Sequence, residues 1–460
     1  MTDPCALTAS HLAARVRARE LSREEVLAAH LDRVAAIDGD VRAFIEPVER
    51  ASALARARAA DGAGAERAGL PLDGVPVSLK DHFDVEGMRR TDGVRAFAQR
   101  RSPGTSVAVQ RLIDGGATVV GKTNQPDFKV RWNTISDVHG ATRNPRDLSL
   151  SAGGSSGGDA AAVAAGMAAV GLGTDLGGSI RVPASFCGVW GLRTTPGQVP
   201  DVRLVEPRYP TPAAALFSSI GVLARSVDDL KLVFDAVRGP HPADPLSVAA
   251  AVDAVAPTPR RVARLCGQAG ATVTPEVEAR LDRTCALLAD AGYEVVDAAM
   301  PAAERLPELW GALAGTEMKR VALPRWRPVM GESGLQHAEE LFGLFELEDG
   351  VAPFATAMAE RLAHAAATAE WMEDHPLVVS PVAGMATPAL DFDEHLPTAA
   401  VRDLFDRMRN ALWVNLLGLP AVALPNGIQL VARRFREADA FAAATAVADA
   451  LEPVTIAGAD

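Results

Sequence analysis

The chain has 460 residues, a formal net charge of −12 and 48% hydrophobic residues. This is ordinary globular composition with enough apolar content for a large core, and it excludes intrinsic disorder. The 58 acidic residues outnumber the 46 basic ones and no basic tract stands out, which argues against a protein that binds nucleic acid.

Cysteine spacing and hydropathy indicate the compartment. The four cysteines are far apart and form no C-x-x-C pair, so we expect reduced thiols without a disulfide or a zinc site; they are Cys5, Cys187, Cys266 and Cys285. No secretory signal is visible in the first residues. The longest apolar stretch, residues 160–173, is too short and too rich in Ala and Gly to span a bilayer. We therefore expect a cytoplasmic protein that does not enter a membrane.

The first part of the chain alternates between helix and strand patterns. Apolar spacing predicts two helices within residues 8–37, separated near residues 19–22, with Ser22 and Glu25 forming a capping box. Further helices are expected at 50–60 and 106–114. Short buried strands are expected at 74–79, with Lys80 at the end, and at 117–120. This alternation predicts an α/β fold.

The later part of the chain continues the alternation. We expect a helix at 228–237, a surface crossover at 235–256, a strand at 261–266, a helix at 275–291 and a strand at 294–296. Residues 300–375 are expected to be mostly helical, residues 377–380 and 421–424 to be buried strands, and residues 437–451 to be a closing helix. No repeat or long linker requires a domain boundary.

The most unusual segment is a Gly/Ser run at residues 153–158, followed at once by the Ala-rich run 159–165. A Gly/Ser run is usually a flexible linker. This one opens onto an expected buried helix with Asp159 in its first turn, which a linker would not do. A second run, residues 173–179, ends in Ser179. Glycines let backbone N–H groups approach a ligand closely, so the two runs suit an oxyanion hole or an anion nest.

Three other motifs are alternatives for these runs. Gly153-x-Ser155-x-Gly157 matches the nucleophile elbow of an α/β-hydrolase, but that elbow follows a strand and residues 143–147 are expected to be a loop. A P-loop would need Lys and then Ser or Thr at the end of the run, where Asp159 stands. The spacing of the second run fits a dinucleotide fingerprint poorly.

Taken together, these segments closely resemble the amidase signature family. The resemblance rests on residues 153–158, 173–184 and 186–192, and it extends to residues 77–81, 121–124, 220–230, 418–421 and 428–431. It covers most of the chain except roughly residues 240–375. It implies an α/β fold with a mixed central sheet covered by helices, one domain over residues 1–460, a signature core at about 70–230 and a variable, mostly helical substrate-side region at about 240–375.

The family's chemistry is a Ser-cisSer-Lys triad, and the resemblance places it on this chain. Ser179 occupies the nucleophile position, Ser155 the bridging serine after a cis peptide bond from Gly154, and Lys80 the base. The chemistry is coherent by itself, because a lysine acts as a base only when neutral and burial against apolar residues lowers its pKa. The resemblance also implies that Leu176, Gly177, Gly178 and Ser179 offer backbone N–H groups to the oxyanion.

Several other side chains have either two alternative interpretations or an expected role in stabilising the signature loop. Arg131 is a candidate for a carboxylate on the substrate, with a structural ion pair as the alternative, and Gly154, Trp310 and Trp326 are candidates for lining the substrate site. Tryptophans on helical segments more often belong to the core, which is the alternative for both. His82 and Asp84 could suggest a metal, but no second ligand cluster exists, so we expect no metal and no cofactor. Arg181 and Asp175 are expected to brace the signature loop, and Cys187 is expected to be a core thiol.

The sequence therefore predicts an amidohydrolase that cleaves a small carboxylic amide through an acyl-enzyme on Ser179. One alternative is the glutaminase subunit of an amidotransferase. Residues 217–222 read Phe-Ser-Ser-Ile-Gly-Val, unlike the corresponding stretch of that subunit, and residues 128–134 resemble the free-standing amidases, so a free-standing amidase is favoured. The loop at 425–429 is shorter than in most relatives. A catalytically silent scaffold is the other alternative, which the intact triad opposes. A small-molecule amide is the expected partner, without nucleic acid or membrane, and a homodimer is possible.

Overall fold

The computed structural model describes residues 3–62, 69–206, 208, 210–250, 260–267, 269–345, 347–348, 350–451 and 454–457. In this part of the chain, eleven strands form one sheet in the order β1-β3-β2-β8-β10-β9-β14-β15-β13-β11-β12. Their bounds are β1 Phe44–Pro47, β2 Pro76–Lys80, β3 Thr118–Thr123, β8 Val170–Asp175, β9 Trp190–Arg193, β10 Ser219–Ala224, β11 Arg261–Arg264, β12 Glu294–Asp297, β13 Leu377–Pro381, β14 Ala421–Ala423 and β15 Ile428–Ala432.

The sheet is mixed. Strands β3, β2 and β8 run parallel to one another, as do β13, β11 and β12, while β8, β10, β9, β14, β15 and β13 pair antiparallel along the sequence of neighbours. Edge strand β1 pairs antiparallel with β3. The expected single domain with a mixed sheet covered by helices is confirmed.

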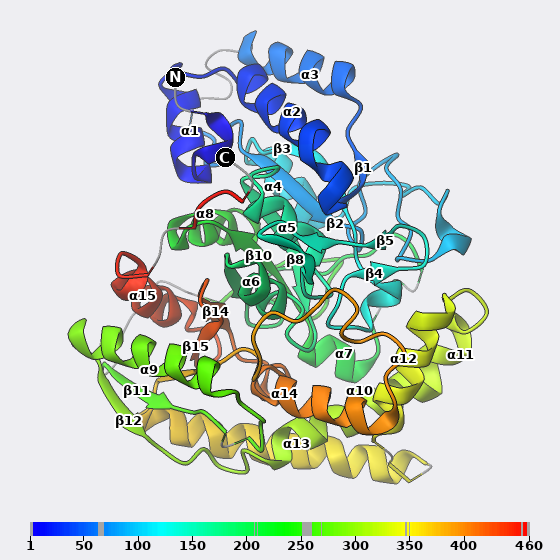
Figure 1. Cartoon of the computed structure of the whole chain (residues 1–460), viewed down its shortest axis with the longest axis vertical. Coiled ribbons are helices and arrows are strands. Elements are labelled where there is room, and N and C mark those ends of the chain that lie inside the picture. Colours follow the sequence, from blue (N-terminus) through cyan, green and yellow to red (C-terminus); the bar gives the residue numbers. More distant parts are fainter. Residues whose placement is uncertain are drawn as a thin grey trace.

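Helices cover both faces of the sheet (Figure 1). Their bounds are α1 Ala9–Arg17, α2 Arg23–Val41, α3 Arg50–Gly62, α4 Val107–Asp114, α5 Gly157–Ala164, α6 Arg181–Cys187, α7 Pro212–Phe217, α8 Val227–Val237, α9 Pro275–Asp290, α10 Arg305–Glu317, α11 Leu323–Trp326, α12 Glu332–Gly343, α13 Val351–Asp374, α14 Thr398–Leu417 and α15 Glu437–Ala448. A π-helical turn, Met318–Ala322, joins α10 to α11.

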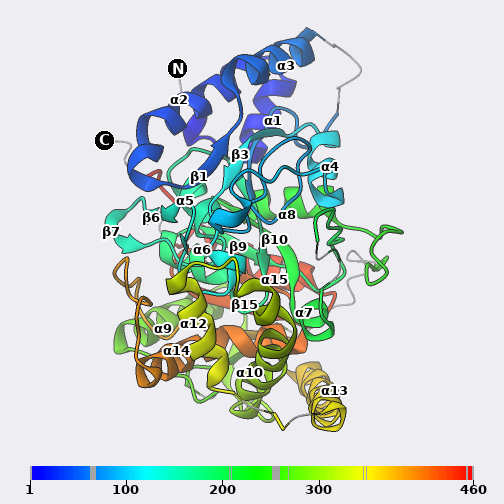
Figure 2. The same cartoon turned by 90° about the vertical axis from the view of Figure 1, so that its right-hand side faces the viewer.

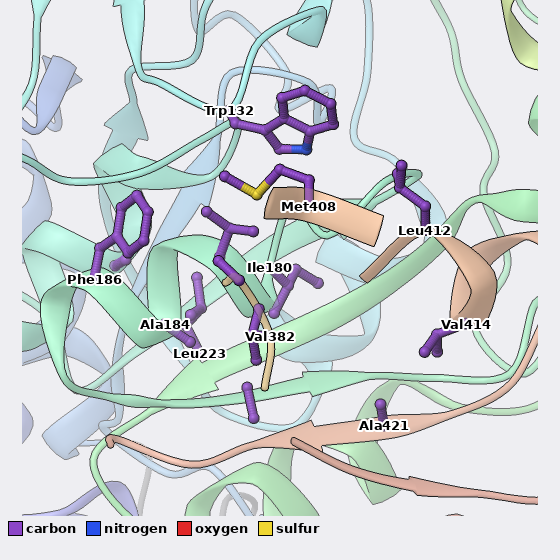
Figure 3. Close-up of a cluster of buried hydrophobic side chains, with 14 of the residues drawn as sticks. Trp132, Ile180, Ala184, Phe186, Leu223, Val382, Met408, Leu412, Val414 and Ala421 are labelled. Atoms are coloured by element: carbon purple, nitrogen blue, oxygen red, sulfur yellow. The ribbon is translucent and has the colours of Figure 1, made fainter. Parts of the chain in front are cut away.

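Alternate residues of the strands enter two hydrophobic clusters. On β10, Ile220 and Val222 belong to the cluster that includes α1, α4, α8, α9 and α15, whereas Leu223 belongs to the cluster that includes α5, α6, α10 and α14. This alternation is the period of two expected of a strand buried on both faces. Figure 3 shows part of the second cluster, with Trp132, Met408 and Leu412 gathered in it.

Two groups of helices lie at opposite ends of the long axis of the molecule. Figure 2 shows α1, α2 and α3 at one end and α10, α12, α13 and α14 at the other. The predicted helical character of residues 300–375 is confirmed by α10 to α13. The expected break between the first two helices is also confirmed, and Ser22 and Glu25 form the predicted capping box at the start of α2.

One local prediction is wrong. Residues 143–147, expected to be a loop, contain β6 (Arg143–Asn144) and the start of β7 (Asp147–Ser151), which pair as a small hairpin. Pro145 and Arg146 form the tight turn between Asn144 and Asp147, so little chain is left to mark the strands in sequence. This hairpin lies outside the main sheet, so β7 does not supply the central strand from which a nucleophile elbow projects.

Two segments of the later chain differ in how well their sequence indicates their structure. Residues 238–250 of the expected crossover contain no helix or strand, and residues 251–256 lie outside the described residues. Helix α14 has no counterpart among the predicted elements. Every side chain from Met408 to Leu417 is buried, so the second half of the helix has no polar face to reveal a helical period. The first half does have one, because Arg402 and Asp403 are not buried whereas Leu404 is.

Candidate active site

Lys80 is the last residue of β2, and its side chain is fully buried. Its Nζ lies 2.8 Å from Ser155 Oγ, 2.9 Å from Ser156 Oγ and 3.2 Å from Thr174 Oγ1. Burial lowers the Lys80 pKa to about 7, although the carboxylates of Asp159 and Asp175 act in the opposite direction. A lysine in this environment can lose its proton near neutral pH.

The two glycine-rich runs meet at Lys80 and at each other. The peptide bond between Gly154 and Ser155 is cis, as expected. The backbone N–H of Ser156 donates to the carbonyl of Ser179 at 3.1 Å, which ties the first run to the second. Gly154 packs so closely that a Cβ on it would lie 2.6 Å from the backbone nitrogen of Asn133. Only glycine fits there, so this residue positions Ser155 through close backbone packing.

Two tryptophans hold the loop that connects β8 to Ser179. Trp310 Nε1–H donates to the carbonyl of Leu176 at 3.0 Å, and Trp132 Nε1–H donates to the carbonyl of Gly177 at 2.8 Å. In a trans peptide the N–H points opposite to the C=O. The Leu176 carbonyl therefore directs the Gly177 N–H away from the Trp310 indole.

Asp175, the last residue of β8, stabilises the same loop. It accepts hydrogen bonds from the backbone N–H groups of Gly178 (2.8 Å) and Ile180 (3.2 Å) and pairs with Arg181 at 3.0 Å. Burial alone would raise the Asp175 pKa, but the guanidiniums of Arg181 and Arg193 hold it below its ordinary value. The predicted bracing role of Arg181 and Asp175 is confirmed. The Gly178 N–H, predicted as an oxyanion donor, is engaged by Asp175 instead.

A cavity of about 450 Å³ opens beside these groups. Ser155, Thr174, Leu176, Gly177 and Ser179 are part of its lining. The lining also holds an aromatic and apolar group of residues, which consists of Phe97, Phe128, Trp132, Trp310, Met318, Trp326 and Phe342. The rings of Phe128 and Trp326 stack in parallel with centroids 4.4 Å apart. Trp310 and Trp326 thus line the cavity, as one of the two sequence interpretations proposed.

Arg131 also borders the cavity, but its guanidinium is occupied. It forms a buried ion pair with Asp393, with Nη2 2.6 Å from Oδ1, and Nη1 donates to Ser333 Oγ at 2.9 Å. The sequence left open whether Arg131 meets a substrate carboxylate or a structural partner. The contacts favour the structural ion pair.

His82 and Asp84 have protein partners as well. His82 lies between Lys129 and Asp201, while Asp84 pairs with Arg90 at 2.9 Å. Over the described ranges, no group of three His, Cys, Asp or Glu side chains is arranged to hold a metal ion. Cys187 is fully buried, and burial raises its pKa to about 12.

Sequence reasoning missed three polar groups at Lys80. Ser156 and Thr174 contact Nζ directly, and Asp159 lies behind it on α5, where it accepts a hydrogen bond from Ser78 Oγ at 2.9 Å. Burial raises the Asp159 pKa to about 7. Ser78 and Lys80 are two residues apart on β2 and share one face of the strand, a spacing that could have revealed the pair.

Comparison with known proteins decides the family. A family model described as Amidase matches residues 25–440. The chain belongs to the amidase family. Its members hydrolyse C–N bonds, so the chain is an amidohydrolase of this family.

Among curated relatives of this amidase-family chain, two differ in their described roles. Indoleacetamide hydrolase of Bradyrhizobium diazoefficiens is 32% identical over 95% of this chain and 84% of its own length. A glutamyl-tRNA(Gln) amidotransferase subunit from Acidothermus cellulolyticus is 37% identical over 75% of this chain and 69% of its own length. The family includes both free enzymes and subunits of complexes.

The amidase fold is also shared with a solved hydrolase. The structure of 6-aminohexanoate cyclic dimer hydrolase in complex with substrate superposes with a TM-score of 0.84 and 27% identity, covering 98% of each chain. Within the residues described, no helix of this amidase is both long and apolar enough to cross a membrane.

Proposed function

We propose that this chain hydrolyses a small carboxylic amide through an acyl-enzyme on Ser179, with Lys80 as the base acting through Ser155. The observation that carries the proposal is the environment of Lys80. Its Nζ contacts three hydroxyl groups and, among the described residues, forms no ion pair with a carboxylate. A buried lysine without a close counter-ion favours its neutral form.

The hydroxyl groups around Nζ can satisfy the hydrogen bonds of that form. A neutral amine has two N–H donors and one lone pair. Ser156 Oγ–H donates to the carbonyl of Thr174 at 3.4 Å, which leaves its own oxygen free to accept from Lys80. If Thr174 Oγ1 accepts the second N–H, the lone pair faces Ser155 Oγ at 2.8 Å. Ser155 can then give its proton to Lys80 and take one from Ser179.

The reaction follows in two halves. Ser179 Oγ attacks the amide carbon while its proton passes to Ser155 and the proton of Ser155 passes to Lys80. The C–N bond breaks as the ammonium of Lys80 returns a proton through Ser155 to the leaving nitrogen. Water then attacks the acyl-enzyme by the same route, and the acid is released with Ser179 and neutral Lys80 restored.

The oxyanion is stabilised by backbone N–H groups at the turn after β8. Leu176, Gly177 and Ser179 remain as candidate donors, since the Gly178 N–H is directed to Asp175. The Gly177 position has no room for a side chain, because a Cβ would lie 2.9 Å from the Trp310 ring. Preorganised donors of this kind act where charge develops in the transition state.

The cavity indicates the kind of amide. Its aromatic wall, which includes Trp310 and Trp326, favours a substrate with an apolar or aromatic body. The relatives are consistent with this class, since they include an indoleacetamide hydrolase. The cytoplasmic location and the homodimer expected from the sequence remain predictions.

The test is an amide-hydrolysis screen on the purified chain, followed by Ser179→Ala. We expect the variant to lose turnover by about 10³-fold or more because the nucleophile is gone. Ser52→Ala, on the exposed face of α3, is the matched control and keeps wild-type turnover. Mass spectrometry of wild-type enzyme quenched during turnover would locate the acyl group on the peptide that contains Ser179. A Ser179→Ala variant with wild-type turnover would contradict the proposal.

A second candidate is the glutaminase subunit of an amidotransferase. It is favoured by the 37% identity to the glutamyl-tRNA(Gln) amidotransferase subunit of Acidothermus cellulolyticus. If the chain alone hydrolyses simple amides, and added amidotransferase subunits do not increase the rate, the free enzyme is supported. Turnover of glutamine alone, and only with a partner protein present, would support the second candidate.

A further inference from the structure

Some of the basic side chains that line the cavity have a carboxylate partner among the described residues and others do not. Arg131 is paired with Asp393, and Arg203 pairs with Asp201 at 2.6 Å. Arg90 is paired with Asp84 at 2.9 Å. Among the cations of this wall, Lys129 has no carboxylate within ion-pair distance in the part of the chain that the structure describes.

The carboxylates of the cavity are already engaged. Asp92 pairs with Arg100 at 2.5 Å, and Glu206 lies 3.4 Å from Arg208. Glu317 accepts hydrogen bonds from the backbone N–H groups that begin α7, at 2.8 and 3.2 Å. The cavity therefore offers a lysine that lacks a counter-ion and, among the described residues, no free carboxylate to pair with it.

Lys129 is held in place by its neighbours. Its Nζ donates to His82 Nδ1 at 2.7 Å, and His82 Nε2 in turn lies 3.4 Å from Asp201 Oδ1. The backbone of Phe128 and Lys129 adopts positive φ angles of 45° and 67°, a region that non-glycine residues rarely occupy. Such a conformation persists where the surrounding structure enforces it, often at a binding site.

The electrostatics of Lys129 point to a missing anion. Burial, together with the positive charge of Arg203 and that of Lys80 when it is protonated, lowers the Lys129 pKa well below its ordinary value, while Asp201 and Asp92 oppose the shift. An anion bound in the cavity would supply the absent counter-ion and favour the ammonium. A second cation, Arg325, is exposed at the same cavity and has no ion-pair partner within the described ranges.

We propose that the amide cleaved at Ser179 carries a carboxylate at its far end, and that Lys129 binds this carboxylate inside the cavity. The proposal rests on the proposed function, because it assigns the two ends of one substrate to Ser179 and Lys129, which line the same cavity. The aromatic residues of that cavity would hold the apolar body. The residue that the sequence suggested for this task, Arg131, is two positions away and is used by Asp393.

The substrates for the test are monoamides of straight-chain and phenylene-linked dicarboxylic acids, in a series of increasing length. Each is paired with the neutral amide in which a methyl group replaces the carboxylate. The measured quantity is the ratio of kcat/KM for the acidic amide to kcat/KM for its neutral partner. We expect wild-type enzyme to prefer the acidic member at one length, and Lys129→Met to reduce the ratio about 10- to 100-fold, as loss of one charged hydrogen bond does.

Two further variants make the result interpretable. Lys129→Gln keeps an N–H for His82 but removes the charge, so it carries the test if Lys129→Met does not fold. Lys231→Met removes an exposed lysine of α8 that does not line the cavity, and it should leave the ratio unchanged. An unchanged ratio in both Lys129 variants, or a wild-type preference for neutral amides at every length, would overturn the proposal.

Binding to Ser179→Ala separates this proposal from the catalytic one. Isothermal titration with the same acidic amides should give an affinity that falls when Lys129→Met is added to Ser179→Ala. Such a result would support Lys129 as the carboxylate site even if Ser179→Ala retained turnover and the proposed mechanism failed. Absence of both binding and turnover of every acidic amide would refute the role of Lys129.

Discussion

The indole N–H of Trp310 donates to the backbone carbonyl of Leu176 at 3.0 Å and thereby joins the helical region after residue 300 to the loop that carries Ser179. Trp310 lies on α10 and Leu176 directly follows β8. The bond fixes the orientation of the peptide whose N–H belongs to Gly177. A residue far from the signature segment thus positions a candidate oxyanion donor.

Trp310→Phe should lower kcat more than it raises KM. The ring still fills the cavity wall, but the carbonyl of Leu176 loses its donor and the Gly177 N–H loses its fixed direction. Loss of one preorganised donor costs about 10²–10³ in kcat, and misorientation should cost no more than that. Trp371→Phe on α13, whose ring stacks on His375, is the control. A higher KM with an unchanged kcat in Trp310→Phe would show that Trp310 only binds substrate.

The pH dependence of kcat/KM should follow the titration of Lys80. The proposed mechanism requires the neutral amine, so we expect activity to rise with pH and to level off above a midpoint near 7, the value to which burial lowers the Lys80 pKa. Arginine stays protonated in this range, so Lys80→Arg should be nearly as inactive as Lys80→Ala. Steady-state kinetics across pH, with circular dichroism as a check on folding, measures this. An active arginine variant with an unchanged profile would remove Lys80 from the mechanism.

Asp159 provides a matched test of the same base. Its carboxylate raises the Lys80 pKa, so Asp159→Asn should move the acid limb of the profile to lower pH. A merely structural role would lower activity at every pH and leave the midpoint in place. Asp147→Asn, at an exposed position on β7, should have neither effect.

Activity should survive exhaustive chelation. The proposed chemistry assigns the base to Lys80 and the oxyanion to backbone N–H groups, and neither needs a metal ion. Dialysis against EDTA followed by the amide assay measures this. Loss of activity that zinc restores would refute a mechanism without metal.

Arg131→Met should destabilise the fold strongly. It leaves the buried carboxylate of Asp393 without its ion-pair partner, a change that typically costs about 3–5 kcal/mol. The double variant Arg131→Met/Asp393→Leu removes both charges and should recover much of that loss. Thermal or urea unfolding measures both variants. A single variant as stable as wild type would show that the pair contributes little.

The sequence alone determined many of the local elements and pointed to the members of the proposed triad. The capping box at Ser22 and Glu25 depends on residues three apart, and the position of Lys80 at the end of β2 depends on a short apolar run. Such features are set by neighbouring residues, so periodicity and capping rules find them. The glycine-rich runs revealed the resemblance because close backbone packing, as at Gly154, leaves no room for other residues.

Only the tertiary structure decided which polar groups meet. Arg131 pairs with Asp393, Trp310 reaches Leu176 and Lys129 reaches His82 across long separations in sequence. No local pattern encodes these contacts, because they follow from the order of strands in the sheet and from the helices packed on it. The same reason explains why the Gly178 N–H was assigned to the oxyanion from sequence, whereas the folded chain directs it to Asp175. Partners of a buried polar group are chosen by packing, which brings donors and acceptors together only once the core has formed.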